Sequence, residues 1–139
     1  MEKPKVIYQD FSKLVSRELP LKIGALLVES ANENIENQQD IHGKPFKKRK
    51  RKRGKKGSQR NKGAVLVDTG AMRRSVRKQT SKGAVKILAK PYAEHHQEGT
   101  KNLDQREFIG VGDETEEKLD DLVEKELDNF FKNLGFKKK

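Results

Sequence analysis

Residues 113–135 read DETEEKLDDLVEKELDNFFKNLG, the most strongly patterned stretch of this chain. Its apolar residues recur at steps of three and four, which predicts a long helix with one apolar face. Asp113 and Glu116 have the spacing of a capping box at the start of that helix, and Gly135 stands where a left-handed residue ends it, with Phe136 packing back. The apolar face consists of Leu119, Leu122, Val123, Leu127, Phe130, Phe131 and Leu134.

Two further helices are expected in the N-terminal part of the chain. The first is short and begins with Asp10 as its N-cap. Pro20 is expected to break or restart it, because proline fits the first turn of a helix and disrupts the interior. Apolar residues at helical spacing from Leu21 then predict a helix to about Gln38, which the segment His42-Gly43-Lys44-Pro45 ends.

The middle of the chain shows shorter patterns, and together they predict a small, mostly antiparallel sheet. The fold class is therefore α+β, with N-terminal helices and a long C-terminal helix packed on the sheet. A long basic loop, at about residues 43–63, is inserted after the N-terminal helix. The expected elements are an ordered stretch at 64–67, a helical turn at 71–75, strands at 76–80 and 84–89 around a turn at 81–83, a helical turn at 92–97 and a strand at 108–111.

The composition predicts one domain with a thin core. The chain has 139 residues, of which 32% are apolar and 38% are charged, and it has no tryptophan. Such a domain buries little apolar area alone, so we expect contacts between subunits. The absence of cysteine excludes disulfides and thiolate metal sites. Neither an apolar signal region nor a stretch long enough to span a membrane is recognisable, so no membrane partner is expected.

The positive charge of the chain belongs to one segment. Twelve basic residues lie between Lys44 and Lys62, and no acidic residue interrupts residues 41–67. The rest of the chain has 20 basic and 21 acidic residues, which nearly cancel, so the net charge of +11 comes from this segment. Such a segment buries nothing and repels itself, which predicts a mobile loop suited to a polyanion. The candidate nucleic-acid contacts are Lys47, Lys48, Arg49, Lys50, Arg51, Lys52, Arg53, Lys55 and Lys56.

Several functions remain open for this segment from the residues alone. It could contact DNA, act as a localisation-like patch, bind RNA, or form a solvated loop. Sequence-specific recognition is not expected, because lysines without interleaved aromatic residues contact phosphates rather than base edges.

No catalytic or metal-binding motif is recognisable. His95 and His96 point about 100° apart on a helix, so they do not chelate one ion together. Asp68-Thr69-Gly70 lacks the glycine spacing of a phosphate-binding loop and has no identifiable base beside it, so a capped turn is the preferred interpretation. We therefore expect no enzyme activity, no metal and no cofactor.

Four patches, in order, resemble the phage virion morphogenesis family, which contains tail-completion and head–tail joining proteins of tailed phages. The first patch is Asn34 to Phe46, where the family often has Gly-x-Pro-Trp and this chain has Gly43-Lys44-Pro45-Phe46. The second, Leu66 to Val76, carries Asp68, Thr69, Gly70 and Ser75. The third, Tyr92 to Gly99, carries Tyr92, His96, Gln97 and Gly99. The fourth, Arg106 to Gly110, carries Arg106, Phe108 and Gly110, with Glu107 where the family has proline.

The resemblance implies a structural virion protein in the neck or at the head-proximal end of the tail, assembled in the host cytoplasm. It implies a homo-oligomeric ring, for which six-fold symmetry is our first expectation, around the passage for duplex DNA. Its partners would be other neck, portal-side or tail proteins. The alternative is a basic accessory protein that binds nucleic acid, such as a ribosome-associated RNA binder.

Overall fold

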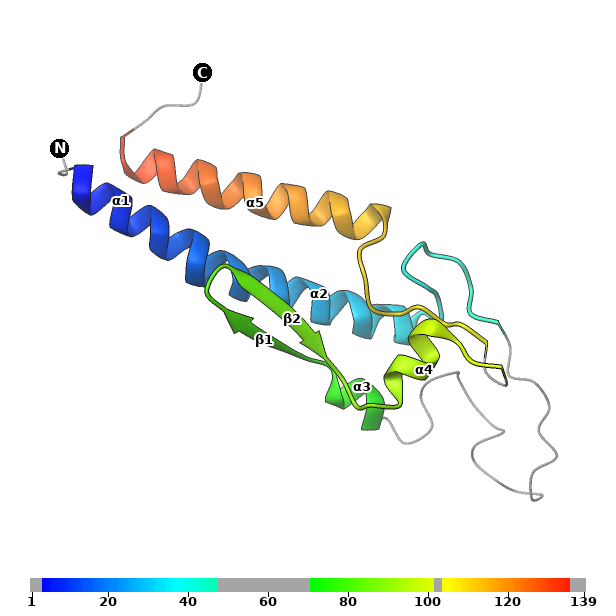
Figure 1. The fold of residues 1–139 in the computed structure, drawn as a ribbon. Helices are drawn as coiled ribbons and strands as arrows, with labels where there is room; N and C mark the ends of the chain where they lie inside the picture. Colours follow the sequence, from blue (N-terminus) through cyan, green and yellow to red (C-terminus); the bar gives the residue numbers. More distant parts are fainter. Residues whose placement is uncertain (1–3, 48–70, 102–103, 136–139) are drawn as a thin grey trace.

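The computed structural model describes residues 4–47, 71–101 and 104–135 and has an α+β fold (Figure 1). The expected fold class is confirmed, with helices at both ends of the chain and a small antiparallel sheet. In chain order the elements are α1 (Pro4–Lys13), a π-helical turn η1 (Leu14–Glu18), α2 (Leu19–Glu36), α3 (Ala71–Ser75), β1 (Arg77–Ser81), β2 (Ala84–Leu88), α4 (Ala93–Glu98) and α5 (Asp113–Asn133).

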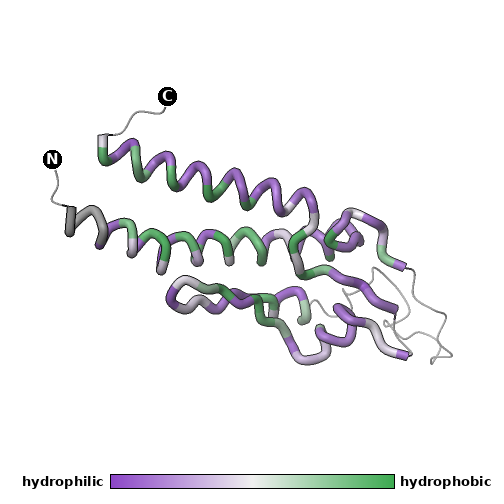
Figure 2. The backbone as a smooth tube through the Cα atoms, turned by 45° about the horizontal axis from the view of Figure 1, so that its top comes forward, coloured by the Kyte–Doolittle hydropathy of each residue, from purple (hydrophilic) through white to green (hydrophobic). Residues whose placement is uncertain are grey.

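Helix α2 forms the middle of three layers. Helix α5 lies along one side of it and the β1–β2 hairpin along the other (Figures 1 and 2). Towards α5, Ser30 and Thr115 share a hydrogen bond of 3.0 Å between their hydroxyl groups. Towards the hairpin, Gly24 lets the strands approach closely, because a Cβ atom there would lie 2.9 Å from Val85 Cγ2. The two outer layers therefore face solvent in opposite directions.

The N-terminal helices are continuous, so the expected start at Asp10 is wrong, and of the two outcomes expected at Pro20 the structure shows the restart and not the break. Helix α1 already begins at Pro4, and η1 joins it to α2 without interruption. In this wider turn the Leu19 N–H donates to the Leu14 carbonyl, five residues earlier. Pro20 lies just after it, at the start of α2, where a missing N–H and a fixed φ cost little. Helix α2 ends at Glu36, two residues before the expected end.

The hairpin is confirmed, with Arg77 paired with Leu88 and Ser81 paired with Ala84. Gly83 has a φ of +73° in its turn and donates its N–H to the Ser16 carbonyl at 3.1 Å, which fixes the turn on η1. The expected strand at 108–111 does not form. The side chains of Asn34 and Gln97 bond to its backbone groups and take the place of a neighbouring strand.

The buried core lies at the C-terminal end of α2. Ile35 and Phe108 are fully buried there. The cluster consists of Ala31, Ile35, Met72, Val76, Ala93 and Phe108. Figure 2 shows hydrophobic residues along α2 and along β2. Among the described residues, none of the helices is long and apolar enough to cross a membrane.

Helix α5 packs more loosely than its pattern predicts. Thr115 is its only buried residue, and Phe131 is 44% exposed. The expected capping box is wrong, because Gly112 is the N-cap, Asp113 is already helical, and no side chain bonds to the cap. The left-handed end at Gly135 is confirmed by a φ of +93°, whereas Phe136 lies outside the described residues.

Candidate functional site: the base of the basic segment

Most of the candidate nucleic-acid contacts lie outside the described residues. Of the nine, only Lys47 is described. The capping residues of the second patch, Asp68, Thr69 and Gly70, and the stretch at 64–67 also lie outside them. The described segments on either side, which are the loop after α2 and helix α3, lie towards the same end of the molecule, away from the two ends of the chain (Figure 1). The structure thus defines the base from which the basic segment leaves the fold.

A tight loop leads from α2 to this base. Gln38 has a φ of +54°, which turns the chain away from the helix. The Asp40 carboxylate then accepts hydrogen bonds from the His42 and Lys44 N–H groups at 2.9 and 3.0 Å. The Phe46 N–H returns to the Gln38 carbonyl at 2.8 Å. The Asp40 side chain therefore fixes the shape of the loop by binding the backbone of the residues that follow it, as in an Asx turn.

Arg106 clamps the end of this loop. It is 4% exposed, and its Nε and Nη2 atoms both donate to the Lys47 carbonyl, at 3.0 and 2.9 Å. Phe46 packs against the core cluster immediately before. A guanidinium presents its donors as a rigid fork, so this contact fixes direction as well as position. The position of the chain is therefore fixed at Lys47, where the basic segment leaves the described fold.

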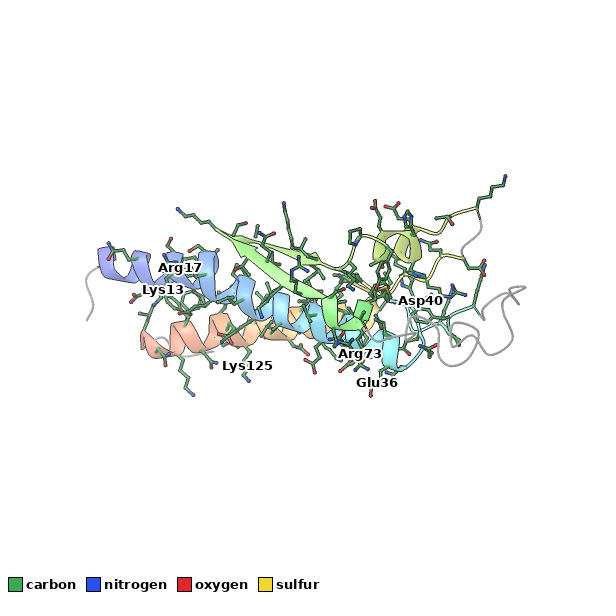
Figure 3. The ribbon with its side chains drawn as sticks, turned by 90° about the horizontal axis from the view of Figure 1, so that it is seen from below. Lys13, Arg17, Glu36, Asp40, Arg73 and Lys125 are labelled. Atoms are coloured by element: carbon green, nitrogen blue, oxygen red, sulfur yellow. The ribbon has the colours of Figure 1, made fainter. Side chains whose placement is uncertain are left out.

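The other side of the base is α3, which follows the basic segment. Met72 is 4% exposed and belongs to the core cluster. The Ser75 hydroxyl donates to the Met72 carbonyl at 2.6 Å and accepts from the Lys90 N–H at 3.0 Å. Arg73 lies beside Glu36, 3.4 Å away (Figure 3). Ser75 thus joins α3 to the chain that leaves the hairpin.

Gln97 organises the third and fourth patches. Its Oε1 atom accepts from the Phe108 and Ile109 N–H groups at 3.2 and 3.1 Å, and its Nε2 atom donates to the Ile109 carbonyl. One side-chain amide therefore satisfies three backbone groups that the missing strand would otherwise leave unpaired. The Phe108 carbonyl accepts from Asn34 Nδ2 at 3.0 Å.

The remaining residues of these patches have structural positions. Gly99 ends α4 with a φ of +79°, and a Cβ atom there would meet the backbone of Gln105. The His96 carbonyl accepts from the Arg106 N–H at 2.7 Å. Gly110 has a φ of +154° and lies against Ile41. Tyr92 is 43% exposed, with the Lys90 ammonium 5.9 Å from its ring centre.

The structure brings the first, third and fourth patches together around Phe108, and Met72 and Val76 of the second patch belong to the same core cluster. The contacts are hydrogen bonds from the side chains of Asn34, Gln97 and Arg106 to backbone groups. We call these three residues the anchor, because they fix the base of the basic segment to the fold. Within the described residues, no group of three or more histidine or acidic side chains lies close enough to hold a metal ion.

Two parts of this anchor were not predicted from the sequence. Asn34 is 7% exposed and was not assigned a contact, although it lies three residues after Ala31 on the helix face that Ile35 also occupies. A polar residue on an apolar face indicates a buried hydrogen bond. Arg106 was identified only as a motif residue. No sequence signal connects it to the Lys47 carbonyl, because that acceptor is backbone.

Comparison with known proteins agrees with the resemblance of the four patches. A sequence model of the phage virion morphogenesis family matches residues 9–128. No curated protein and no solved structure matches the chain. The match covers all the described elements of the anchor together with the basic segment. The chain therefore belongs to the phage virion morphogenesis family, and its role is in the assembly of a phage virion.

Proposed function

We propose that this chain is a head–tail joining or tail-completion subunit, located in the neck or at the head-proximal tail end of a tailed phage. Its copies form a ring around the passage for duplex DNA. The observation that carries the proposal is the family match over residues 9–128. The anchored base of the basic segment supports it, since it offers a fixed attachment for a cationic chain.

The surface of the subunit supports assembly. Several large apolar side chains are exposed along the helices, with Leu21 at 48%, Val15 at 42% and Phe131 at 44%. The apolar face of α5 has no fully buried member. Large apolar side chains that are exposed in a single subunit can become buried when another subunit covers them. Neighbouring copies in a ring would cover it and supplement the thin core.

The basic segment supports contact with the DNA backbone. Its twelve charges would displace counterions from phosphates irrespective of sequence, as a passage for any genomic DNA requires. A ring ~40 Å thick faces only about two dozen phosphates, because duplex DNA carries one per ~1.7 Å of axis. Six copies would bring more charges than that, so part of the segment would meet acidic protein surfaces or solvent.

The test is a phage in which this gene is deleted and supplied in trans. We expect the deletion to give DNA-filled heads and separate tails, or tails without a completed end, in electron micrographs. An affinity tag on the supplied chain should label the neck of intact virions. Quantitative mass spectrometry of purified virions should find a fixed small number of copies, about six for the expected symmetry.

Two outcomes would contradict the proposal. The chain could be absent from purified virions, which would make it an assembly factor that leaves before completion. It could instead co-purify with host RNA particles while deletion leaves heads and tails joined, as the RNA-binding alternative requires.

A further inference from the structure

Charge is divided between the two outer layers of the subunit. Residues 71–93, which carry the hairpin, contain seven basic residues and no acidic residue. Helix α5 contains nine acidic and three basic residues. Outside the basic segment the charges nearly cancel in number, but they are separated in space: the hairpin side is basic and the α5 side is acidic.

The acidic residues of α5 are concentrated on its outward face. Thr115 marks the inward face through its bond to Ser30, and residues about half a turn away point outward. Glu117, Asp120 and Asp121 lie there and are exposed. Acidic residues in the first turn are explained by the helix dipole, but these three lie beyond it. Like charges three and four residues apart destabilise a lone helix, so this face favours a cationic neighbour.

The outward face of the hairpin is basic. Lys78 and Val85 lie against Gly24, so the alternate residues of the strands face solvent. These include Arg77 and Lys86, which are exposed and are diagonal neighbours across the two strands. Leu88, on the same face, lies opposite Arg77 and two residues after Lys86, and it is half-buried. The hairpin thus presents two cations and an apolar side chain to solvent.

From this division we infer that the outward face of the hairpin docks on the outward face of α5 of a second copy of this chain. The two faces lie on opposite sides of α2, so one subunit cannot pair them with each other (Figure 1). An interface between two different faces is head-to-tail, and such an interface closes into a ring when its rotation permits. The inference rests on the proposed ring and identifies the surfaces that would form it.

The dimensions and the apolar residues are compatible with this contact. Helix α5 has 21 residues and is about 30 Å long, whereas a five-residue strand spans about 17 Å. One hairpin therefore covers roughly half of the helix. Val123 and Leu127 lie beside the acidic face and are half-buried, so Leu88 of a neighbouring hairpin would find apolar partners there.

Charge reversal tests the pairing of the two faces in complemented phage. The Arg77→Glu/Lys86→Glu variant and the Glu117→Lys/Asp120→Lys variant should each lower the yield of infectious particles by at least tenfold. The protein carrying all four substitutions should recover most of that yield, because attraction is restored with its sign exchanged. Lys13→Glu/Lys101→Glu, at exposed sites outside both faces and outside the basic segment, is the matched control and should keep the parental yield. Circular dichroism of each purified variant checks that it folds.

Cross-linking measures the contact directly. The chain has no cysteine, so Lys86→Cys/Asp120→Cys provides two unique thiols on opposite sides of the subunit. A short bismaleimide applied to virions should give a ladder of linked subunits, whereas Lys44→Cys/Asp120→Cys should give none.

Three results would overturn the inference. The first is the absence of a ladder from virions that contain the chain in ring stoichiometry, which leaves the proposed function standing. The second is failure of the fourfold variant while the hairpin variant alone has a lower DNA affinity, which would assign the hairpin to DNA. The third is failure of the subunits to assemble when residues 47–53 are replaced but not when the hairpin is reversed, which would assign the acidic face to the basic segment. If the chain is missing from virions altogether, the proposed function fails together with the inference.

Discussion

The guanidinium of Arg106 holds the backbone carbonyl of Lys47 through two hydrogen bonds, although the two residues are 59 positions apart. This contact joins the segment before α5 to the first residues of the basic segment. In this contact a charged side chain donates to a neutral backbone carbonyl. The neighbouring contacts are made by the side-chain amides of Asn34 and Gln97. The base of the basic segment is therefore part of the folded core.

Replacing Arg106 should destabilise the fold without removing the charges of the basic segment. Arg106→Ala should lower the free energy of unfolding by about 3 kcal/mol, since it removes both bonds that the buried guanidinium makes to the part-buried Lys47 carbonyl. Arg106→Lys should cost less, because an ammonium can replace one bond but not the fork. Urea denaturation measures both. The exposed Arg74→Ala is the control, and an equal decrease there would show that the clamp contributes nothing.

Gly112 should tolerate no side chain. A Cβ atom there would lie 1.7 Å from the Ile41 carbonyl oxygen, so Gly112→Ala must displace the backbone of one segment. We expect the free energy of unfolding to fall by about 3 kcal/mol, at the upper end for overpacking. Gly43→Ala is the contrasting variant, because its Cβ meets nothing within 4 Å and only its φ of +79° opposes it, at a cost of about 1 kcal/mol. Equal decreases for the two variants would show that the Ile41 backbone yields to a side chain without cost.

The Gln97 side chain both donates and accepts hydrogen bonds, so the stability of the fold should be sensitive even to an isosteric substitution there. Gln97→Glu keeps the acceptor for the Phe108 and Ile109 N–H groups but places a carboxylate oxygen against the Ile109 carbonyl. The absence of the donor should cost about 2 kcal/mol at neutral pH. Thermal denaturation should show the lower stability, whereas Gln79→Glu on the exposed face of β1 should change it little. A Gln97→Glu protein as stable as the parent would show that the amide donor of Gln97 contributes nothing.

The sequence predicts the regular elements well because their signals are local. The spacing of apolar residues identified α2, α5 and both strands, and Gly83 and Gly135 marked their turns. It failed where tertiary contacts decide. Residues 108–111 did not form a strand, because Gln97 and Asn34 satisfy their backbone. The clamp on Lys47 depends on a carbonyl, which no residue type encodes.

Removing charge from the basic segment should weaken binding to duplex DNA and leave the fold intact. Replacing residues 47–53 with serine and glycine removes seven cations and no apolar side chain. The slope of log affinity against log salt falls by about 0.9 for each phosphate that the protein no longer neutralises, so the affinity and its salt dependence should decrease together for any DNA sequence. The Arg106 clamp should persist in this variant, since it uses the backbone of Lys47, and the free energy of unfolding should stay near the parental value.

A matched pair of triple variants separates the location of the charge from its total amount. One is Arg51→Ser/Lys52→Ser/Arg53→Ser in the segment, and the other is Arg77→Ser/Lys82→Ser/Lys86→Ser in the hairpin. Fluorescence anisotropy with a labelled duplex over a range of salt concentrations should show the larger change of slope for the first. Equal slopes for the parent and the segment variants would exclude the segment as the DNA contact and leave an acidic protein surface as the only partner for its charge.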